Sequence, residues 1–150
     1  MKQKFSFFVL SLSLGLAGAA LAHTGVKNPA VMARMHAMKG IGAEMKTLGQ
    51  MAKGELPFDA EEARSAASTI AKHAGETPAL FEAQEDDPKS EAKDEIWQNF
   101  EDFSAKSEEL ERIALGLAET ISTQSDMTAA VKSLGATCLA CHKTYREKTP

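Results

Sequence analysis

Several features are scarce or missing in this sequence of 150 residues. After residue 22, valine occurs only at positions 26, 31 and 131, alanine is abundant, and no stretch alternates between polar and apolar residues. This pattern excludes an extended sheet and predicts helices throughout. No internal repeat or low-complexity tract interrupts the chain. The sequence therefore predicts an all-α fold in a single domain.

Positive charge and long apolar runs are also in short supply. The formal net charge is −4 and the basic residues form no stripe, which argues against a nucleic-acid partner. The apolar run over residues 5–18 is shorter than the about 18 to 20 residues that span a bilayer, and it is interrupted by serine and glycine. Residues 1–22 begin with a short basic segment and end with the small-x-small sequence Ala20-Leu21-Ala22. They are therefore predicted to be an export signal cleaved after Ala22. The mature chain, starting at His23, would be periplasmic without a membrane segment.

The only two cysteines, Cys138 and Cys141, lie three positions apart and are followed at once by His142. Cys-x-x-Cys-His is the attachment sequence of a c-type haem, because two thiols at a fixed short distance add across the two vinyl groups of one porphyrin. On a helix the two cysteines share a face, and the imidazole lies where it can reach the iron from the side that anchors the ring. The motif predicts one covalently attached haem c, with Cys138 and Cys141 as thioethers and His142 as the proximal iron ligand.

Three other uses of a Cys-x-x-Cys pair fit the sequence less well. A thioredoxin-type redox pair accompanies a βαβ pattern, which is not visible here. A zinc site needs a second pair of ligands, but the remaining histidines, His23, His36 and His73, are scattered. A disulfide across three residues of one helix has poor geometry. Haem attachment is therefore the preferred interpretation.

Apolar spacing and capping signals predict two helices in the first half of the mature chain. The first is expected over residues 29–53, with Asn28 as its N-cap and Gly54 after its last residue. The second is expected to follow Asp59 as cap and to run to about Ala74, before a glycine.

The second half is predicted to contain one long connection and two further helices. Residues 75–93 form the connection, which is unusually long for a compact domain. Apolar stripes over residues 96–121 and 127–145 predict the third and fourth helices, the fourth capped near Ser125. Four amphipathic helices with three connections make an antiparallel four-helix bundle over residues 23–150, with the haem motif on the core-facing side of the last helix.

Four landmarks give the chain a resemblance to a known family. They are Arg34-x-x-x-Met38-Lys39, Lys53-Gly54-x-x-Pro57-Phe58-Asp59, Glu95-Ile96-Trp97, and Gly135-x-x-Cys138-x-x-Cys141-His142-x-x-Tyr145-Arg146. In this order, on an exported four-helix chain, they resemble the class II cytochromes c, the cytochrome c prime family. The resemblance covers essentially the whole mature chain. It implies that a residue of the first helix faces the iron opposite His142.

The resemblance places the family's distal position at Met38. In the low-spin branch of the family a methionine there binds iron and the protein is an electron carrier. In the other branch a non-coordinating residue leaves the iron five-coordinate and able to bind NO or CO. Met38 therefore implies the low-spin branch, in which a buried thioether raises the reduction potential. Helical periodicity alone does not choose between Met38 and Met35, and core packing is the commoner role of methionine.

The other candidate residues are placed by helical geometry and by the resemblance. His36 lies about 200° around the helix from Met38, so it is expected on the surface if Met38 faces the haem. The resemblance implies that Arg34 pairs with a haem propionate. Trp97 is expected to pack near the haem or the end of the bundle. His73 is expected to interact with the helix dipole or with solvent.

The predicted function is that of a periplasmic electron carrier with no catalytic residues, because six-coordinate iron has no open position. Its partners would be redox proteins, and Lys143, Arg146 and Lys148 could guide an acidic one. Two alternatives are a five-coordinate protein that binds NO or CO, with Met38 packed above open iron, and a peroxidase-like enzyme, which the residues support less. A homodimer is left open, since the alanines of the second helix could pack against another subunit or inside the bundle.

Overall fold

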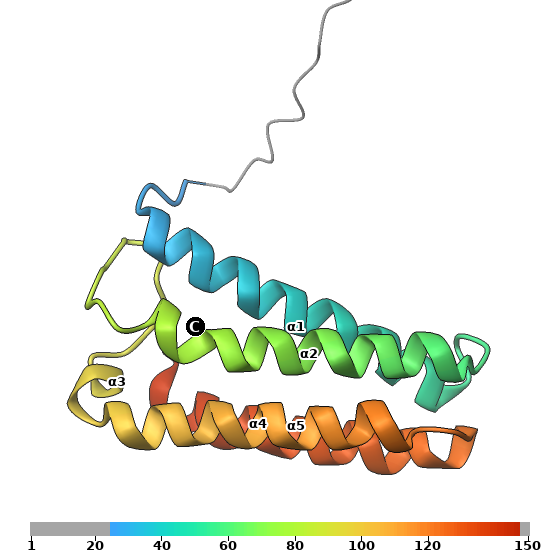
Figure 1. The fold of residues 1–150 in the computed structure, drawn as a ribbon. Coiled ribbons are helices and arrows are strands. Elements are labelled where there is room, and N and C mark those ends of the chain that lie inside the picture. Colours follow the sequence, from blue (N-terminus) through green and yellow to red (C-terminus); the bar gives the residue numbers. More distant parts are fainter. Residues whose placement is uncertain (1–24, 148–150) are drawn as a thin grey trace, which may run out of the picture.

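A computed structural model describes residues 25–147, and the predicted export signal, His23 and Lys148 lie outside this part of the chain. The described residues form the helices α1 (Pro29–Lys53), α2 (Ala60–Leu80), α3 (Glu95–Gln98), α4 (Phe100–Thr120) and α5 (Gln124–Tyr145). The four long helices run in alternating directions (Figure 1). Each packs against two others, in the cyclic order α1, α2, α4, α5. The predicted antiparallel four-helix bundle is confirmed.

Helix α1 has the predicted bounds because both of its ends carry strong local signals. The side chain of Asn28 accepts hydrogen bonds from the backbone N–H groups of Ala30 and Val31, at 2.8 and 3.2 Å. Gly54 has a φ of 73°, a left-handed conformation that glycine adopts without strain, and its N–H donates to the Met51 carbonyl at 3.0 Å. These caps satisfy backbone groups that the helix itself leaves unpaired.

Helix α2 is longer than predicted, since it continues through Gly75 and Pro78 to Leu80. Proline lacks an N–H group, so the carbonyl of Ala74 loses its usual donor within the helix. The hydroxyl of buried Ser107, in α4, donates to that carbonyl at 2.8 Å instead. A Cβ at Gly75 would lie 2.6 Å from Oε1 of Glu111, also in α4. Gly75 and Pro78, which predicted the end of a helix, instead lie within α2 where it closely contacts α4.

The boundaries of the last two predicted helices also need correction. The predicted third helix is broken at Asn99, whose φ of −131° and ψ of 48° separate the short α3 from α4. Helix α5 has Thr123 as its N-cap, not Ser125, and Asp126 completes a reciprocal capping box with Thr123. The predicted apolar stripe of α5 nevertheless faces the interior, because Met127 and other residues on it are fully buried.

The interior consists of two apolar clusters. The main cluster joins all four long helices, and its largest fully buried side chains are Leu48, Met51, Ile70, Ile121, Met127 and Leu134. The aromatic cluster lies at the end of the bundle where α1 and α4 begin and α5 ends (Figure 1), and it consists of Phe81, Ile96, Phe103 and Tyr145. Trp97 packs against the aromatic cluster, so its predicted place at the bundle end is confirmed.

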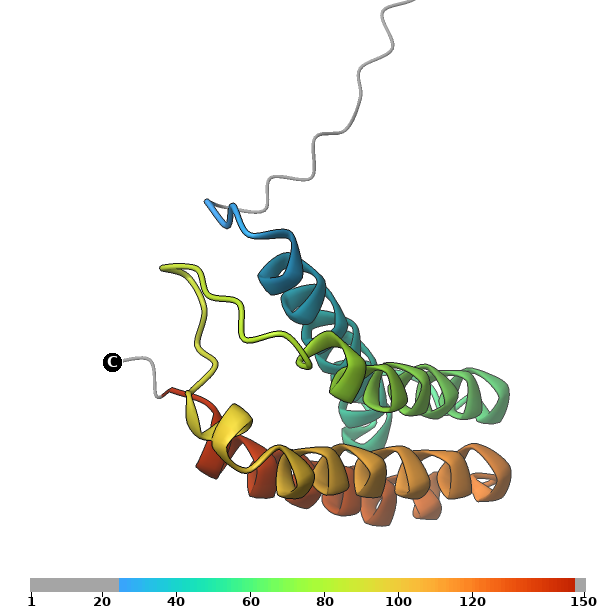
Figure 2. The ribbon, with the colours of Figure 1, turned by 60° about the vertical axis from the view of Figure 1, so that its left-hand side comes forward.

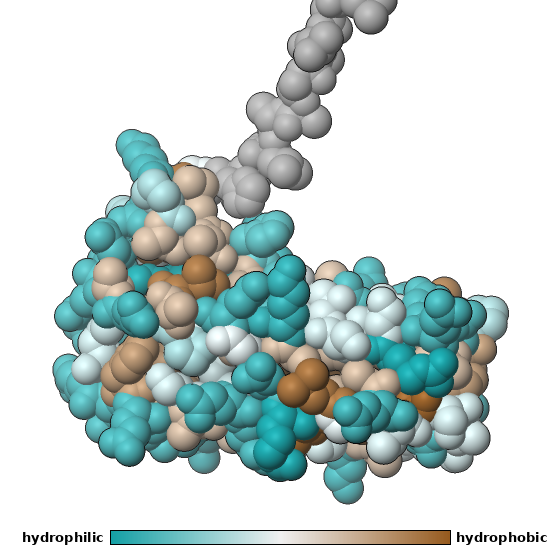
Figure 3. Space-filling model, viewed as in Figure 1, coloured by the Kyte–Doolittle hydropathy of each residue, from teal (hydrophilic) through white to brown (hydrophobic). Residues whose placement is uncertain are grey.

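The alanine stripe of α2 packs inside the bundle. Its members are each at most 3% exposed: Ala63, Ala66, Ala67, Ala71 and Ala74. This stripe is therefore covered within one chain and does not offer a surface to a second subunit. The face drawn in Figure 3 is mainly hydrophilic, with small and separate apolar patches. Among the described residues, no helix combines the length and apolar character needed to cross a membrane.

Candidate haem site

Helix α5 carries Cys138, Cys141 and His142 in its last two turns, and all three side chains are half-buried. Cys138 packs against the main cluster and Cys141 against the aromatic cluster, so the two thiols face the interior at the boundary between the clusters. The cysteines are free thiols and form no disulfide with each other. The motif thus lies on the core-facing side of the helix, as the apolar stripe predicts.

The surroundings of these side chains favour their neutral forms. Burial raises the pKa of the Cys138 thiol, and it raises the pKa of the Cys141 thiol to about 11. Burial also lowers the pKa of His142, and Arg146 lowers it further while Glu91 acts in the opposite direction. An imidazole binds iron in its neutral form, so this environment suits an iron ligand.

These residues fit a haem c better than they fit a bare metal ion. Within residues 25–147, no group of three or more histidine, cysteine or acidic side chains is arranged to hold a metal. The two thiols instead lie on one helical face, one packed against each of the two apolar clusters, so a flat apolar ring attached to both would lie beside apolar side chains. Cys138 and Cys141 would hold the ring, and His142 would supply the axial nitrogen.

Helix α1 contacts α5, which bears the motif, and the methionines of α1 differ in how they pack. Among the described residues, the half-buried methionines that pack against the main cluster are Met38 and Met45. Cys138 packs against that same cluster, and α1 contacts α5 directly. Met35 is half-buried but does not belong to this set. Met38 and Met45 thus share with Cys138 the cluster that they pack against, whereas Met35 does not.

The two other histidines of the helices lie on the outer side of the α1–α2 contact. His36 is exposed, as predicted. His73 is not simply solvated, which corrects the expectation for it. Its half-buried ring packs against Gly40 of α1 and lies edge-on to the His36 ring, with 6.4 Å between the ring centroids.

Arg34 is buried, with only 3% of its surface exposed. Its guanidinium donates hydrogen bonds to backbone carbonyls at the end of α2 and just after it. Nε donates to the carbonyl of Leu80 at 2.9 Å, Nη2 to that of Ala83 at 2.6 Å, and Nη1 to that of Glu85 at 2.8 Å. Burial lowers the pKa of Arg34, and the carboxylates of Glu85 and Asp86 oppose that shift. The resemblance predicted a propionate partner for this side chain, but it did not predict these three bonds.

Asp87 is a buried acid that sequence reasoning missed. Its Oδ2 accepts hydrogen bonds from the backbone N–H groups of Lys27 and Asn28, at 2.8 and 3.1 Å, and its Oδ1 accepts from Lys89 at 2.9 Å. These bonds hold the pKa of the carboxyl below its ordinary value. The local signal was present in the Asp87-Pro88 pair, which favours a turn, but nothing local indicates a bond to residues about 60 positions away.

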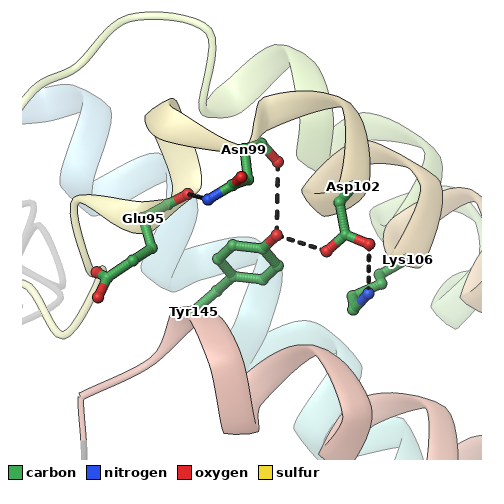
Figure 4. A network of polar contacts seen from close by, with 5 residues as sticks. All are labelled: Glu95, Asn99, Asp102, Lys106 and Tyr145. Carbon is green, nitrogen blue, oxygen red and sulfur yellow. Dashed lines mark hydrogen bonds and ion pairs between the residues drawn. The ribbon is translucent and has the colours of Figure 1, made fainter.

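The last turn of α5 is fixed by a polar network around Tyr145 (Figure 4). The phenol donates to Oδ2 of Asp102 at 2.5 Å and lies 3.5 Å from the Asn99 carbonyl oxygen. Lys106 donates to the other oxygen of Asp102 at 2.7 Å. Burial and the bond to Asp102 raise the pKa of Tyr145 to about 12. Because Tyr145 follows His142 by one turn, this network holds the motif-bearing part of α5 against α4.

Two of the three basic residues predicted to guide a partner lie in the described part of the chain, and both are exposed. Lys143 is exposed beside the motif. Arg146 forms an ion pair with Glu91, with 2.6 Å between Nη2 and Oε2. The backbone of residues 91–93 pairs with that of residues 145–147 through two hydrogen bonds, which ties the connection before α3 to the end of α5.

Comparisons with known proteins agree with this arrangement. A family model described as Cytochrome C' matches residues 29–146. Cytochrome c-556 of Agrobacterium tumefaciens (strain B2A) is 43% identical over 112 residues, which cover 74% of this chain and 91% of that protein. Cytochrome c' of Pararhodospirillum photometricum is 38% identical over 118 residues, covering 76% and 93%. The solved structure of cytochrome c' from Rhodopseudomonas palustris superposes with a TM-score of 0.77 at 25% identity, covering 83% of this chain and 100% of that one. Because the family match spans every long helix and the Cys-x-x-Cys-His motif, the chain belongs to the cytochrome c' family and carries one covalently attached haem c.

Proposed function

We propose that this protein is an electron carrier whose haem iron is bound by His142 on one side and by the Met38 thioether on the other. One observation carries the proposal. Met38 and Cys138 pack against the same apolar cluster, from the contacting helices α1 and α5. A thioether that shares the surroundings of a haem-bearing cysteine is well placed to serve as the second axial ligand.

The haem supplies a one-electron exchange at its iron, and the residues of the chain set the conditions for it. The two apolar clusters that Cys138 and Cys141 pack against would limit the access of water to the ring, and a thioether ligand would favour the ferrous form. Both effects raise the reduction potential. With both axial positions filled, we expect no enzymatic turnover of a substrate at the iron.

The second candidate function is the binding of NO or CO at a five-coordinate iron. Met38 would then be an ordinary core side chain, a role that methionine often fills. The relatives of the chain include proteins named cytochrome c-556 and proteins named cytochrome c', so similarity alone favours neither function.

We also place the carrier in the periplasm, after removal of residues 1–22, with other redox proteins as partners. Leu139, between the two cysteines, is 68% exposed, and Lys143 is exposed one turn later. This small surface lies on the outer side of the helix that bears the haem. A brief encounter there, steered by charge, would suit electron exchange.

Optical and EPR spectra of the oxidised holoprotein, with CO uptake by the reduced form, distinguish the two functions. An electron carrier should be low-spin, show a weak far-red sulfur-to-iron band, and take up little CO. The change Met38→Ala should abolish the band and open the iron to CO, whereas Met35→Ala should do neither. A high-spin wild type that binds CO readily would establish the gas-binding function instead.

A further inference from the structure

The first part of α1 is attached at two points to residues 80–87, which form the last residue of α2 and the segment that follows it. At one point the Arg34 guanidinium, on α1, reaches the carbonyls of residues 80–85. At the other, the Asp87 carboxylate reaches back to the backbone that enters α1. In Figure 2 the start of α1 leans away from α4 and α5, while its later turns lie close to them. The two attachments therefore act on the part of α1 that leans away from α4 and α5.

The Arg34 attachment is directional and is enclosed by aromatic rings. Its three hydrogen bonds use three of the five N–H groups of a guanidinium. The guanidinium carbon lies 4.6 Å from the ring centroid of Phe81 and 5.4 Å from that of Trp97. A buried charge is tolerated only when it is well bonded, so the conformation of residues 80–85 and the position of Arg34 determine each other.

The Asp87 attachment fixes the entry of α1. Asp87 is 6% exposed and accepts from the N–H groups of Lys27 and Asn28. Asn28 is itself the N-cap of α1, and its side-chain amide donates to Glu85 at 2.8 Å. The N-cap of α1 is thus held from both sides, by its own helix and by the segment after α2.

Met38 lies one turn after Arg34, so any shift of this part of α1 moves the thioether. We propose that Arg34 and Asp87 are positioning residues that hold Met38 at the iron by clasping α1 to residues 80–90. This inference rests on the proposed function, because it assigns the clasp to a methionine ligand. The clasp works through backbone carbonyls and N–H groups.

The test compares the clasp variants Asp87→Asn and Arg34→Lys with matched controls at the opposite end of the bundle. Asp126 likewise accepts from backbone N–H groups at a helix start, those of Ser122 and Thr123, at 3.0 and 2.8 Å. Arg64 likewise donates from α2 to a backbone carbonyl, that of Ile121, at 2.9 Å. The control Asp126→Asn removes the carboxylate charge that strengthens such bonds, and Arg64→Lys removes the guanidinium donor. Neither control touches the first part of α1.

Three properties of each holoprotein are measured: the rate of CO uptake by the reduced form, the far-red sulfur-to-iron band of the oxidised form, and the midpoint of urea unfolding. We expect both clasp variants to take up CO at least about tenfold faster than wild type and to weaken the band. The controls should lower the unfolding midpoint, while their CO uptake stays within about twofold of wild type. Asp87→Asn keeps the inference testable if Arg34→Lys does not fold.

Two results would overturn the inference. In the first, clasp and control variants of equal stability take up CO at equal rates, which would make the clasp a purely structural feature. In the second, wild type is already high-spin and Met38→Ala changes nothing, which would also remove the proposed function. If wild type is low-spin and Met38→Ala speeds CO uptake but the clasp variants do not, the proposed function stands and only the clasp is rejected.

Discussion

Replacing Gly40 by alanine tests the contact between α1 and α2, next to the turn that bears Met38. A Cβ at Gly40 would lie 2.6 Å from Nε2 and 2.8 Å from Cδ2 of His73. The His73 ring is half-buried and lies edge-on to the His36 ring. Its buried Nδ1 is 3.4 Å from a carboxylate oxygen of Glu76, an ion-pair distance without hydrogen-bond geometry. A methyl group at Gly40 must therefore displace either the ring or the helix.

Two opposing effects set the size of the change. Alanine in a helix interior is about 1 kcal/mol more favourable than glycine. Forcing a methyl group into occupied space costs about 1 to 3 kcal/mol. Gly40→Ala is therefore expected to lower the free energy of unfolding by about 0 to 2 kcal/mol. At Gly42, in the same helix, no described atom would lie within 4 Å of an added Cβ, so Gly42→Ala should raise that free energy by about 0.5 to 1 kcal/mol.

Urea unfolding of the holoproteins, followed by helical circular dichroism, measures both free energies. In the double variant with His73→Ala, the ring no longer blocks the methyl group at position 40, so the higher helix propensity of alanine should raise the free energy of unfolding. The double variant should therefore be more stable than His73→Ala alone. If Gly40→Ala stabilises the protein as much as Gly42→Ala does, the His73 ring yields freely and the contact does not set the spacing of α1 and α2.

Two further predictions concern buried polar groups. Ser107→Ala should lower the free energy of unfolding by about 1 to 3 kcal/mol, because the Ala74 carbonyl loses its donor, and an unchanged urea midpoint would refute this. Tyr145 is the only tyrosine, and its pKa is raised to about 12, so phenolate absorbance of the native protein should appear only well above pH 10. The native state then holds a proton that the unfolded state releases, so stability is lost as the pH rises past about 10, and a native titration midpoint near 10 would contradict the buried geometry.

The helices could be predicted where their ends are decided locally. Asn28 and Gly54 act on backbone groups within their own turns, and α1 accordingly begins and ends where predicted. The end of α2 could not be predicted in this way, because Ser107 and the side chain next to Gly75 come from another helix. A helix breaker signals an end only when no partner elsewhere supplies the missing donor.

The same distinction applies to the site. The cysteines and histidine of the motif are neighbours in sequence, so their chemistry could be read directly. Arg34 and Asp87 have partners 46 to 60 positions away, and no local pattern indicates such bonds. Met38 lies between these cases. The family resemblance indicated it from the sequence, and its packing against the main cluster, which Met35 does not share, supports the proposal that it binds iron.

The pairing of α1 with α5 has a consequence for how the protein is made. Met38 and Cys138 are 100 positions apart, and their helices are the first and the last of the described chain. The α2–α4 pair spans a much shorter loop and can form earlier, because the entropy lost on closing a loop grows with its length. A chain whose synthesis stops before α5 would keep the apolar lining of the site but lack its attachment point for haem. Such a fragment would expose that apolar lining and would be prone to aggregation and proteolysis. Haem attachment therefore requires a chain that includes α5.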